Sequence, residues 1–124
     1  DDHGVFVGNA MVFCDRVVET HKRFSGTMHC NMNHAIEVEG DKASGEIYNV
    51  TYLFREEGDV HYIDTWFGRY LDQYEKRAGE WRIIERICVH ENTISQVVDA
   101  HMPIDAAKFR NGSADRGTNT PLGC

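Results

Sequence analysis

The sequence predicts an α+β fold organised around one long antiparallel sheet. Residues 28 to 92 are rich in Val, Ile, Thr, Tyr, Phe and Trp, the residue types that strands favour. Breaks that contain glycine, at residues 39–41, 57–59 and 77–80, divide this stretch into four segments. Segments joined by such tight turns form an antiparallel meander. A segment with helical periodicity precedes them, so we expect a helix that packs on the sheet.

The chain opens with a loop, residues 1–8, in which residues 5–7 are expected to form a short strand. Asn9 is a good N-cap, and the apolar residues after it recur at the spacing of one helical face. They are Ala10, Phe13, Cys14, Val17, Val18 and His21. Residues 24–26 end this predicted helix, which must lie against the large apolar surface that the sheet offers.

The predicted strands are longer than usual, and long strands twist and coil. A coiled sheet with helices packed in its concave face makes a cone whose interior pocket is the expected place for a ligand. Beyond the sheet, residues 93–100 either continue the last strand or start a short helix, and residues 104–109 are expected to form one helical turn. The tail, residues 110–124, has no periodicity and is expected to be irregular. No linker divides the chain, so residues 1–124 read as one domain.

Composition limits the classes of partner. Thirteen Lys and Arg against twenty Asp and Glu give a net charge of −7, which disfavours nucleic acid and anionic membranes as partners. No apolar run approaches the roughly 20 residues of a membrane span, and no signal peptide is evident, so we expect a cytoplasmic protein.

Metal and cofactor chemistry find no support in the sequence. The four cysteines, Cys14, Cys30, Cys88 and Cys124, lack metal-site spacing and are expected to be buried thiols. The seven histidines also lack the helix or strand spacing of a first coordination shell. Because no glycine-rich phosphate loop is present either, we expect no metal and no cofactor.

Two residues are candidates for catalysis. His29 begins the first long strand at the rim of the cone, and a histidine with a pKa of about 6.5 can act as a general base; the alternative is a polar strand end exposed to water. Arg86 lies mid-strand among apolar residues, where its charge is costly unless a carboxylate, a substrate or a leaving anion pairs with it. A structural salt bridge, for example to Asp64 or Glu46, is the alternative.

Residues that could line the pocket lie on the middle and last strands. Four amphipathic rings, which could equally belong to the core, are candidates for substrate binding because tyrosine hydroxyls can orient an oxygen. They are Tyr48, Tyr52, Trp66 and Tyr70. On the last strand, strict alternation places Cys88 and His90 on one face with Ile84 and Arg86. This adds Cys88 and His90 to the candidates.

Four stretches then carry a family resemblance. They are Thr27-Met28-His29, residues 36–46, residues 68–77 and the segment Gly79-Glu80-Trp81-Arg82-Ile83. Together they resemble the SnoaL-like branch of the nuclear transport factor 2-like (NTF2-like) superfamily. The T-x-H placement and the arginine five residues after the hairpin tryptophan look most like hexachlorocyclohexane dehydrochlorinase and scytalone dehydratase. The resemblance implies a cofactor-free lyase in a cone-shaped α+β fold, typically a trimer.

The resemblance also implies roles for residues. His29 would abstract a proton, Arg86 would face the leaving group, and rings near Tyr70 would line the pocket. In these families an aspartate on an N-terminal helix holds the histidine, and we expect such N-terminal helices to be missing from this sequence. The predicted function is a cofactor-independent dehydratase, dehydrohalogenase or isomerase acting on a small hydrophobic substrate as a homo-oligomer, dimer or trimer. The alternatives are a non-catalytic small-molecule-binding or assembly domain of the same fold and a polyketide-type cyclase.

Overall fold

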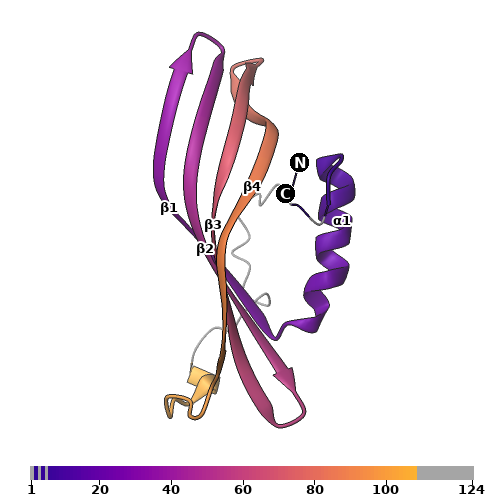
Figure 1. Cartoon of the computed structure of the whole chain (residues 1–124), viewed down its shortest axis with the longest axis vertical. Helices are drawn as coiled ribbons and strands as arrows, with labels where there is room; N and C mark the ends of the chain where they lie inside the picture. The colour runs from indigo at the N-terminus through magenta and orange to yellow at the C-terminus, as the bar shows by residue number, and fades with distance from the viewer. Residues whose placement is uncertain (1, 3, 5, 109–124) are drawn as a thin grey trace.

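The computed structural model of the chain describes residues 2, 4 and 6–108. In order, its elements are helix α1 (Ala10–Thr20), the 3-10 turn η1 (His21–Arg23), strands β1 (Gly26–Glu39), β2 (Lys42–Glu57), β3 (Val60–Arg77) and β4 (Glu80–Val97), and the 3-10 turn η2 (Ala106–Lys108). The strands pair antiparallel in chain order in one open, strongly twisted sheet (Figure 1). The predicted α+β class and meander are therefore confirmed, and residues 93–97 continue the last strand.

Two-residue turns join the strands at the three predicted breaks. Gly40 and Gly58 have φ values of 60° and 59°, and each is the first residue of its turn, as in a type II′ hairpin. The third turn has positive φ at both residues, 51° at Ala78 and 83° at Gly79, as in type I′. These turn types match the right-handed twist of the strands that they connect.

Helix α1 begins where the sequence predicts, because the Asn9 side chain accepts a hydrogen bond of 2.9 Å from the backbone N–H of Met11. The helix runs beside β4 (Figure 1), and none of its residues is buried. Asp2 lies along the edge of β4, where its backbone N–H donates to the Arg86 carbonyl at 2.8 Å. Val7 bridges back to Asp2; Val5, the start of the predicted short strand, is outside the described residues, as are residues 109–124.

Three single-residue bulges set which side chains share a face of the sheet. The pairing of β1 with β2 shifts between Asn31 and His34, and the pairing of β3 with β4 shifts at Ile84 and at Glu91. With these shifts, His29 stands opposite Thr51, Thr51 opposite Trp66, and Trp66 opposite Thr93. We call this side of the sheet the inner face. It also carries Asn31, Asn49, Asp64, Tyr70, Asp72, Tyr74, Arg86, Cys88, His90 and Ser95.

The buried part of the sheet is mostly polar. Among the described residues, only Ala43 and Ile47 are buried apolar residues, whereas four polar residues are buried. These are Asn49, Thr51, Thr65 and Asp72. Each buried polar side-chain atom in the described part of the chain has a hydrogen-bond partner. Such networks hold side chains in one arrangement, because an unpaired buried polar group is costly.

Candidate functional site

His29 projects from the beginning of β1 onto the inner face. It remains exposed to solvent, yet the surrounding protein displaces enough water to lower the pKa of its imidazole below the usual 6.5, and the neighbouring His21 lowers it further. Its ring centroid lies 6.3 Å from that of His21 at the end of the helical segment. A lowered pKa keeps His29 neutral near pH 7, the protonation state that a general base requires.

A buried polar network lies beside His29 on the inner face. The Asn49 side chain, 1% exposed, donates to the side-chain oxygen of Asn31 at 2.9 Å. The Thr51 hydroxyl, directly across from His29, donates to the Asn49 side-chain oxygen at 2.7 Å. These hydrogen bonds hold the polar side chains of the inner face beside His29 in one arrangement.

Two stacked rings lie further along β3 on the same inner face. The rings of Trp66 and Tyr70 have centroids 6.3 Å apart and planes tilted by 22°. Gly68 lies between them on the same face, and a β-carbon there would come within 2.1 Å of the Trp66 ring. His90 lies next to Trp66, with the two ring centroids 6.3 Å apart, and its Nε2 forms a hydrogen bond of 2.8 Å with the Thr93 hydroxyl. Trp66, Tyr70 and His90, all predicted as pocket residues, therefore come together.

Arg86 is held by a carboxylate that the sequence analysis missed. Its Nε and one terminal nitrogen each donate to Asp72 at 2.7 Å, and the Asp72 side chain is completely buried. The Tyr74 hydroxyl donates to the same carboxylate at 2.9 Å, and the guanidinium lies 4.1 Å from the centre of the Tyr70 ring. The bond to Asp72 raises the pKa of Arg86, which burial opposes. Cys88 lies beside this cluster, and burial raises the pKa of its thiol to about 12.

The suggested partners of Arg86 were wrong. Asp64 instead binds Arg55, and its other oxygen accepts from the Ser95 hydroxyl. Glu46 instead binds Arg69 on the opposite face of the sheet, at 2.7 Å. The salt bridge itself, the structural alternative for Arg86, is present, but with Asp72.

His29 and Arg86 do not meet. His29 lies in the row of Trp66 and Arg86 in the row of Asp72, six positions further along β3. At roughly 3.3 Å per residue this separates the two rows by roughly 20 Å along the strand.

Tyr48 and Tyr52 point away from the inner face, in contrast to their predicted place in the pocket. Tyr48 pairs with Arg69, whose guanidinium lies 6.0 Å from its ring, and Tyr52 pairs with Thr65. Both tyrosines belong to the outer face because directly paired residues in an antiparallel sheet share a side.

A groove of about 540 Å³ opens between α1 and β4. Its walls combine the apolar helical face, including Phe13 and Val17, with Ile83, Ile84 and Arg86. Strict alternation placed Ile83 and Ile84 on opposite faces, but the bulge at Ile84 lets both line the groove.

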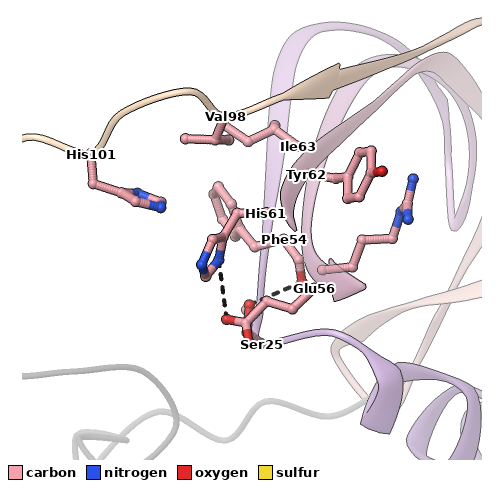
Figure 2. A pocket seen from close by; sticks show the side chains of 10 residues that line it. Ser25, Phe54, Glu56, His61, Tyr62, Ile63, Val98 and His101 are labelled. Carbon is pink, nitrogen blue, oxygen red and sulfur yellow. Dashed lines mark hydrogen bonds and ion pairs between the residues drawn. The ribbon is translucent and has the colours of Figure 1, made fainter. Parts of the chain in front are cut away.

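A second hollow, of about 350 Å³, lies between β2, β3, the start of β1 and the segment that follows β4 (Figure 2). His61 lies there with its Nδ1 3.4 Å from a Glu56 carboxylate oxygen. The His61 and His101 rings form a T-shaped pair with centroids 5.0 Å apart. Phe54, Ile63 and Val98 supply its apolar wall (Figure 2). This histidine cluster was not predicted, since its members are far apart in the sequence.

Within the described residues, no group of three or more His, Cys, Asp or Glu could hold a metal ion, and none of the described cysteines forms a disulfide. Cys124 lies outside the described residues. No helix in the part of the chain that the structure describes is long and apolar enough to cross a membrane.

Comparisons with known proteins place this fold. A search of curated proteins finds no match. Among solved structures, the hexachlorocyclohexane dehydrochlorinase LinA (type 2) matches with a TM-score of 0.66 at 17% identity, over 82% of this chain and 68% of that protein. The "Putative Scytalone Dehydratase" of Novosphingobium aromaticivorans matches with a TM-score of 0.59 at 21% identity, over 77% and 61%. The Kfla4162 protein of Kribbella flavida matches with a TM-score of 0.60 at 16% identity, over 68% and 59%.

At these identities the structural matches establish the fold, an NTF2-like α+β cone, and the chain spans about three fifths of the length of two of the three proteins. The sequence itself matches the family model of the SnoaL-like domain over residues 3–87, more than half of the chain. The chain therefore belongs to the SnoaL-like domain family, in agreement with the resemblance in its motifs.

Proposed function

We propose that the protein is a cofactor-independent lyase or isomerase that binds a small, largely apolar substrate on the inner face and uses His29 as general base. The observation that carries this proposal is the position of His29, whose pKa is lowered and which shares a row of the sheet with Trp66. The fold shared with LinA and the scytalone dehydratase-type protein supports the same class of reaction.

The proposed reaction begins with proton transfer from a substrate carbon to a ring nitrogen of His29. The C–H bond breaks, an N–H bond forms, and the electron pair left on carbon forms a double bond as a halide or hydroxyl group leaves or as a neighbouring double bond moves. Trp66 and Tyr70 offer a flat apolar surface for the substrate. Burial raises the pKa of Tyr70, so its hydroxyl stays protonated and can donate to an oxygen or a halogen.

We assign Arg86 a supporting part in this proposal rather than contact with the leaving group. Two of its donor nitrogens are engaged by Asp72, and its row lies far from that of His29. Its guanidinium packs against the Tyr70 ring, so the pair with Asp72 would hold that ring in place.

The test measures chloride release from hexachlorocyclohexane and dehydration of scytalone, because these compounds appear in the names of the two structurally similar proteins. His29→Gln should lower kcat/KM by about 10² or more, the usual contribution of a general base. The matched control is His61→Gln, because His61 pairs with Glu56 and stands on the outer face of the sheet. Equal turnover by wild type and His29→Gln would contradict the proposal.

A non-catalytic ligand-binding domain is the second candidate. It is favoured by one observation: among the described residues, none makes a hydrogen bond to the His29 ring, which a base would need for orientation. Ligand-induced shifts of the His29 and Trp66 ring resonances without turnover of either substrate would support binding alone.

The predicted homo-oligomer remains part of the proposal. Apolar side chains of the outer face are strongly exposed, for example Met28 and Tyr48, each at 50%, and Ile94 at 42%. Sedimentation equilibrium would give the mass of the assembly, and a monomer at micromolar concentration would contradict this part.

A further inference from the structure

His21 is held in one tautomer by the helix that it ends. It is the C-cap residue of α1, and its Nδ1 lies 2.8 Å from the backbone carbonyl oxygen of Val17. A carbonyl oxygen can only accept, so Nδ1 carries the proton. In the neutral ring, Nε2 is then left as an acceptor with a free lone pair.

This ring lies beside His29. The two imidazole centroids are 6.3 Å apart, with planes tilted by 46°. The centre of the Phe24 ring also lies 5.6 Å from that of His21. The short connection between η1 and β1 is anchored to the sheet, because the Ser25 backbone N–H donates to the Phe54 carbonyl at 2.8 Å. The distance between the two histidines is therefore set by the end of α1, which carries His21, by the anchored connection at Ser25 and by β1, which carries His29.

We propose that His21 is the positioning partner of His29, with its Nε2 accepting a hydrogen bond from the imidazolium that His29 becomes when it takes a proton from substrate. This inference rests on the function proposed above. The separation in the structure without substrate is longer than a direct hydrogen bond, and such bonds commonly tighten when substrate binds.

The proton balance of this pair is complete. The proton removed from carbon resides first on His29, which donates it toward Nε2 of His21. If it passes across, His21 becomes an imidazolium that still donates from Nδ1 to the Val17 carbonyl. It then sits at the C-terminal end of α1, where the helix dipole favours a cation. Since His21 is only half-buried, it can release the proton to water.

Several charged groups of the surrounding elements interact with one another. On the helical side, Lys22 binds Glu19 at 2.7 Å. On the sheet side, Asp64 binds Arg55 and interacts electrostatically with Arg23. In the described part of the chain, the ring that lies beside His29 and acts on its pKa is thus a histidine.

The first test uses wild-type protein and needs no substrate. Nitrogen-15 NMR of the histidine rings distinguishes the two neutral tautomers. We expect His21 to be protonated on Nδ1, opposite to the Nε2–H form that free histidine prefers in water. An Nε2–H form of His21 would overturn the proposal.

The second test follows the titration of His29 in two variants. His21→Phe keeps a ring against Phe24 but can neither donate nor accept, whereas His21→Gln can do both. At the separation of 6.3 Å the two rings interact through charge, and His21 lowers the pKa of His29. In His21→Phe this effect is lost, so we expect the pKa of His29 to lie closer to its usual value than in wild type. An unchanged titration of His29 in His21→Phe would overturn the proposal.

Activity separates this inference from the function on which it rests. If wild type turns over substrate, His21→Phe should lower kcat at least about tenfold with KM little changed, and His21→Gln should recover part of the loss. Full activity in His21→Phe would refute the positioning role while leaving the general base in place. If wild type turns over neither substrate, the proposed function fails, and the NMR results still decide whether the histidines are coupled.

Discussion

The buried Asp72 carboxylate pairs with Arg86 on the inner face, and its removal tests the contribution of this ion pair directly. Asp72 is completely buried and receives two hydrogen bonds of 2.7 Å from Arg86 and one of 2.9 Å from Tyr74. Asp72→Asn keeps the shape of the side chain but removes its charge. The Arg86 guanidinium, 26% exposed, would then stay in the sheet without a counter-ion.

The magnitude follows from this burial. Breaking a buried ion pair by removing one partner costs about 3–5 kcal/mol. Because Arg86 keeps some contact with water, we expect the lower end, about 3 kcal/mol. A domain of this size has a stability of about 5–15 kcal/mol, and its Tm falls by about 4 °C per kcal/mol. The Tm of Asp72→Asn should therefore be about 12 °C below that of wild type.

Urea and thermal unfolding, followed by circular dichroism, would measure this loss against a matched control. Glu80→Gln removes a carboxylate from an ion pair with Arg82 in which both side chains are about two thirds exposed, so it should cost less than about 1 kcal/mol. Adding Arg86→Met to Asp72→Asn should restore at least half of the loss, because the unpaired charge is gone. The reasoning is refuted if Asp72→Asn costs no more than Glu80→Gln, or if the double variant is as unstable as the two single losses added together.

Three further predictions concern a close packing contact, a turn and a proton. Gly68→Ala should destabilise the sheet by roughly 1–3 kcal/mol, since its β-carbon would lie 2.1 Å from the Trp66 ring and 2.3 Å from the Val89 carbonyl oxygen; urea unfolding gives the cost, and unchanged Trp66 fluorescence would count against it. Ala78→Asn should stabilise by roughly 0.5–1 kcal/mol, because Asn tolerates the φ of 51° better than Ala; a lower Tm would contradict this. Because the pKa of His29 is lowered in the folded state, its contribution to stability is present above pH 6.5 and is lost as the pH falls below it, and His29→Gln should flatten that part of the stability curve measured in urea between pH 5 and 8.

The strands and turns could be predicted because their causes are local. Glycines at fixed places allow positive φ, and β-branched and aromatic residues fill the segments between them. The outward position of Tyr48 and Tyr52 was also within reach. Counting back along both strands from the two-residue turn at residues 58–59 pairs Tyr48 with Arg69, as observed. The predicted place of these tyrosines in the pocket was wrong because aromatic rings on adjacent strands share a face only where the strand register pairs them.

The pairing of Arg86 with Asp72 could not be obtained by counting. From the turn at residues 78–79, uninterrupted pairing would set Asp72 opposite Glu85, a repulsive contact. The bulge at Ile84 shifts β4 by one residue and sets Asp72 opposite Arg86 instead. Charge complementarity across the sheet therefore favours the bulge. The sequence alone does not reveal this bulge, because the charge pairing becomes apparent only once the strand register is known.

The same argument decides where the candidate base lies. Counted from the turn at residues 40–41, uninterrupted pairing would set His29 opposite Tyr52, on the outer face. The extra residue between Asn31 and His34 moves His29 opposite Thr51 and onto the inner face with Trp66. A one-residue shift in a strand reverses the side on which every later side chain stands, so this bulge brings His29 to the side where His21 approaches it. The chemistry proposed for this domain thus depends on one irregular position in β1 that carries no catalytic group of its own.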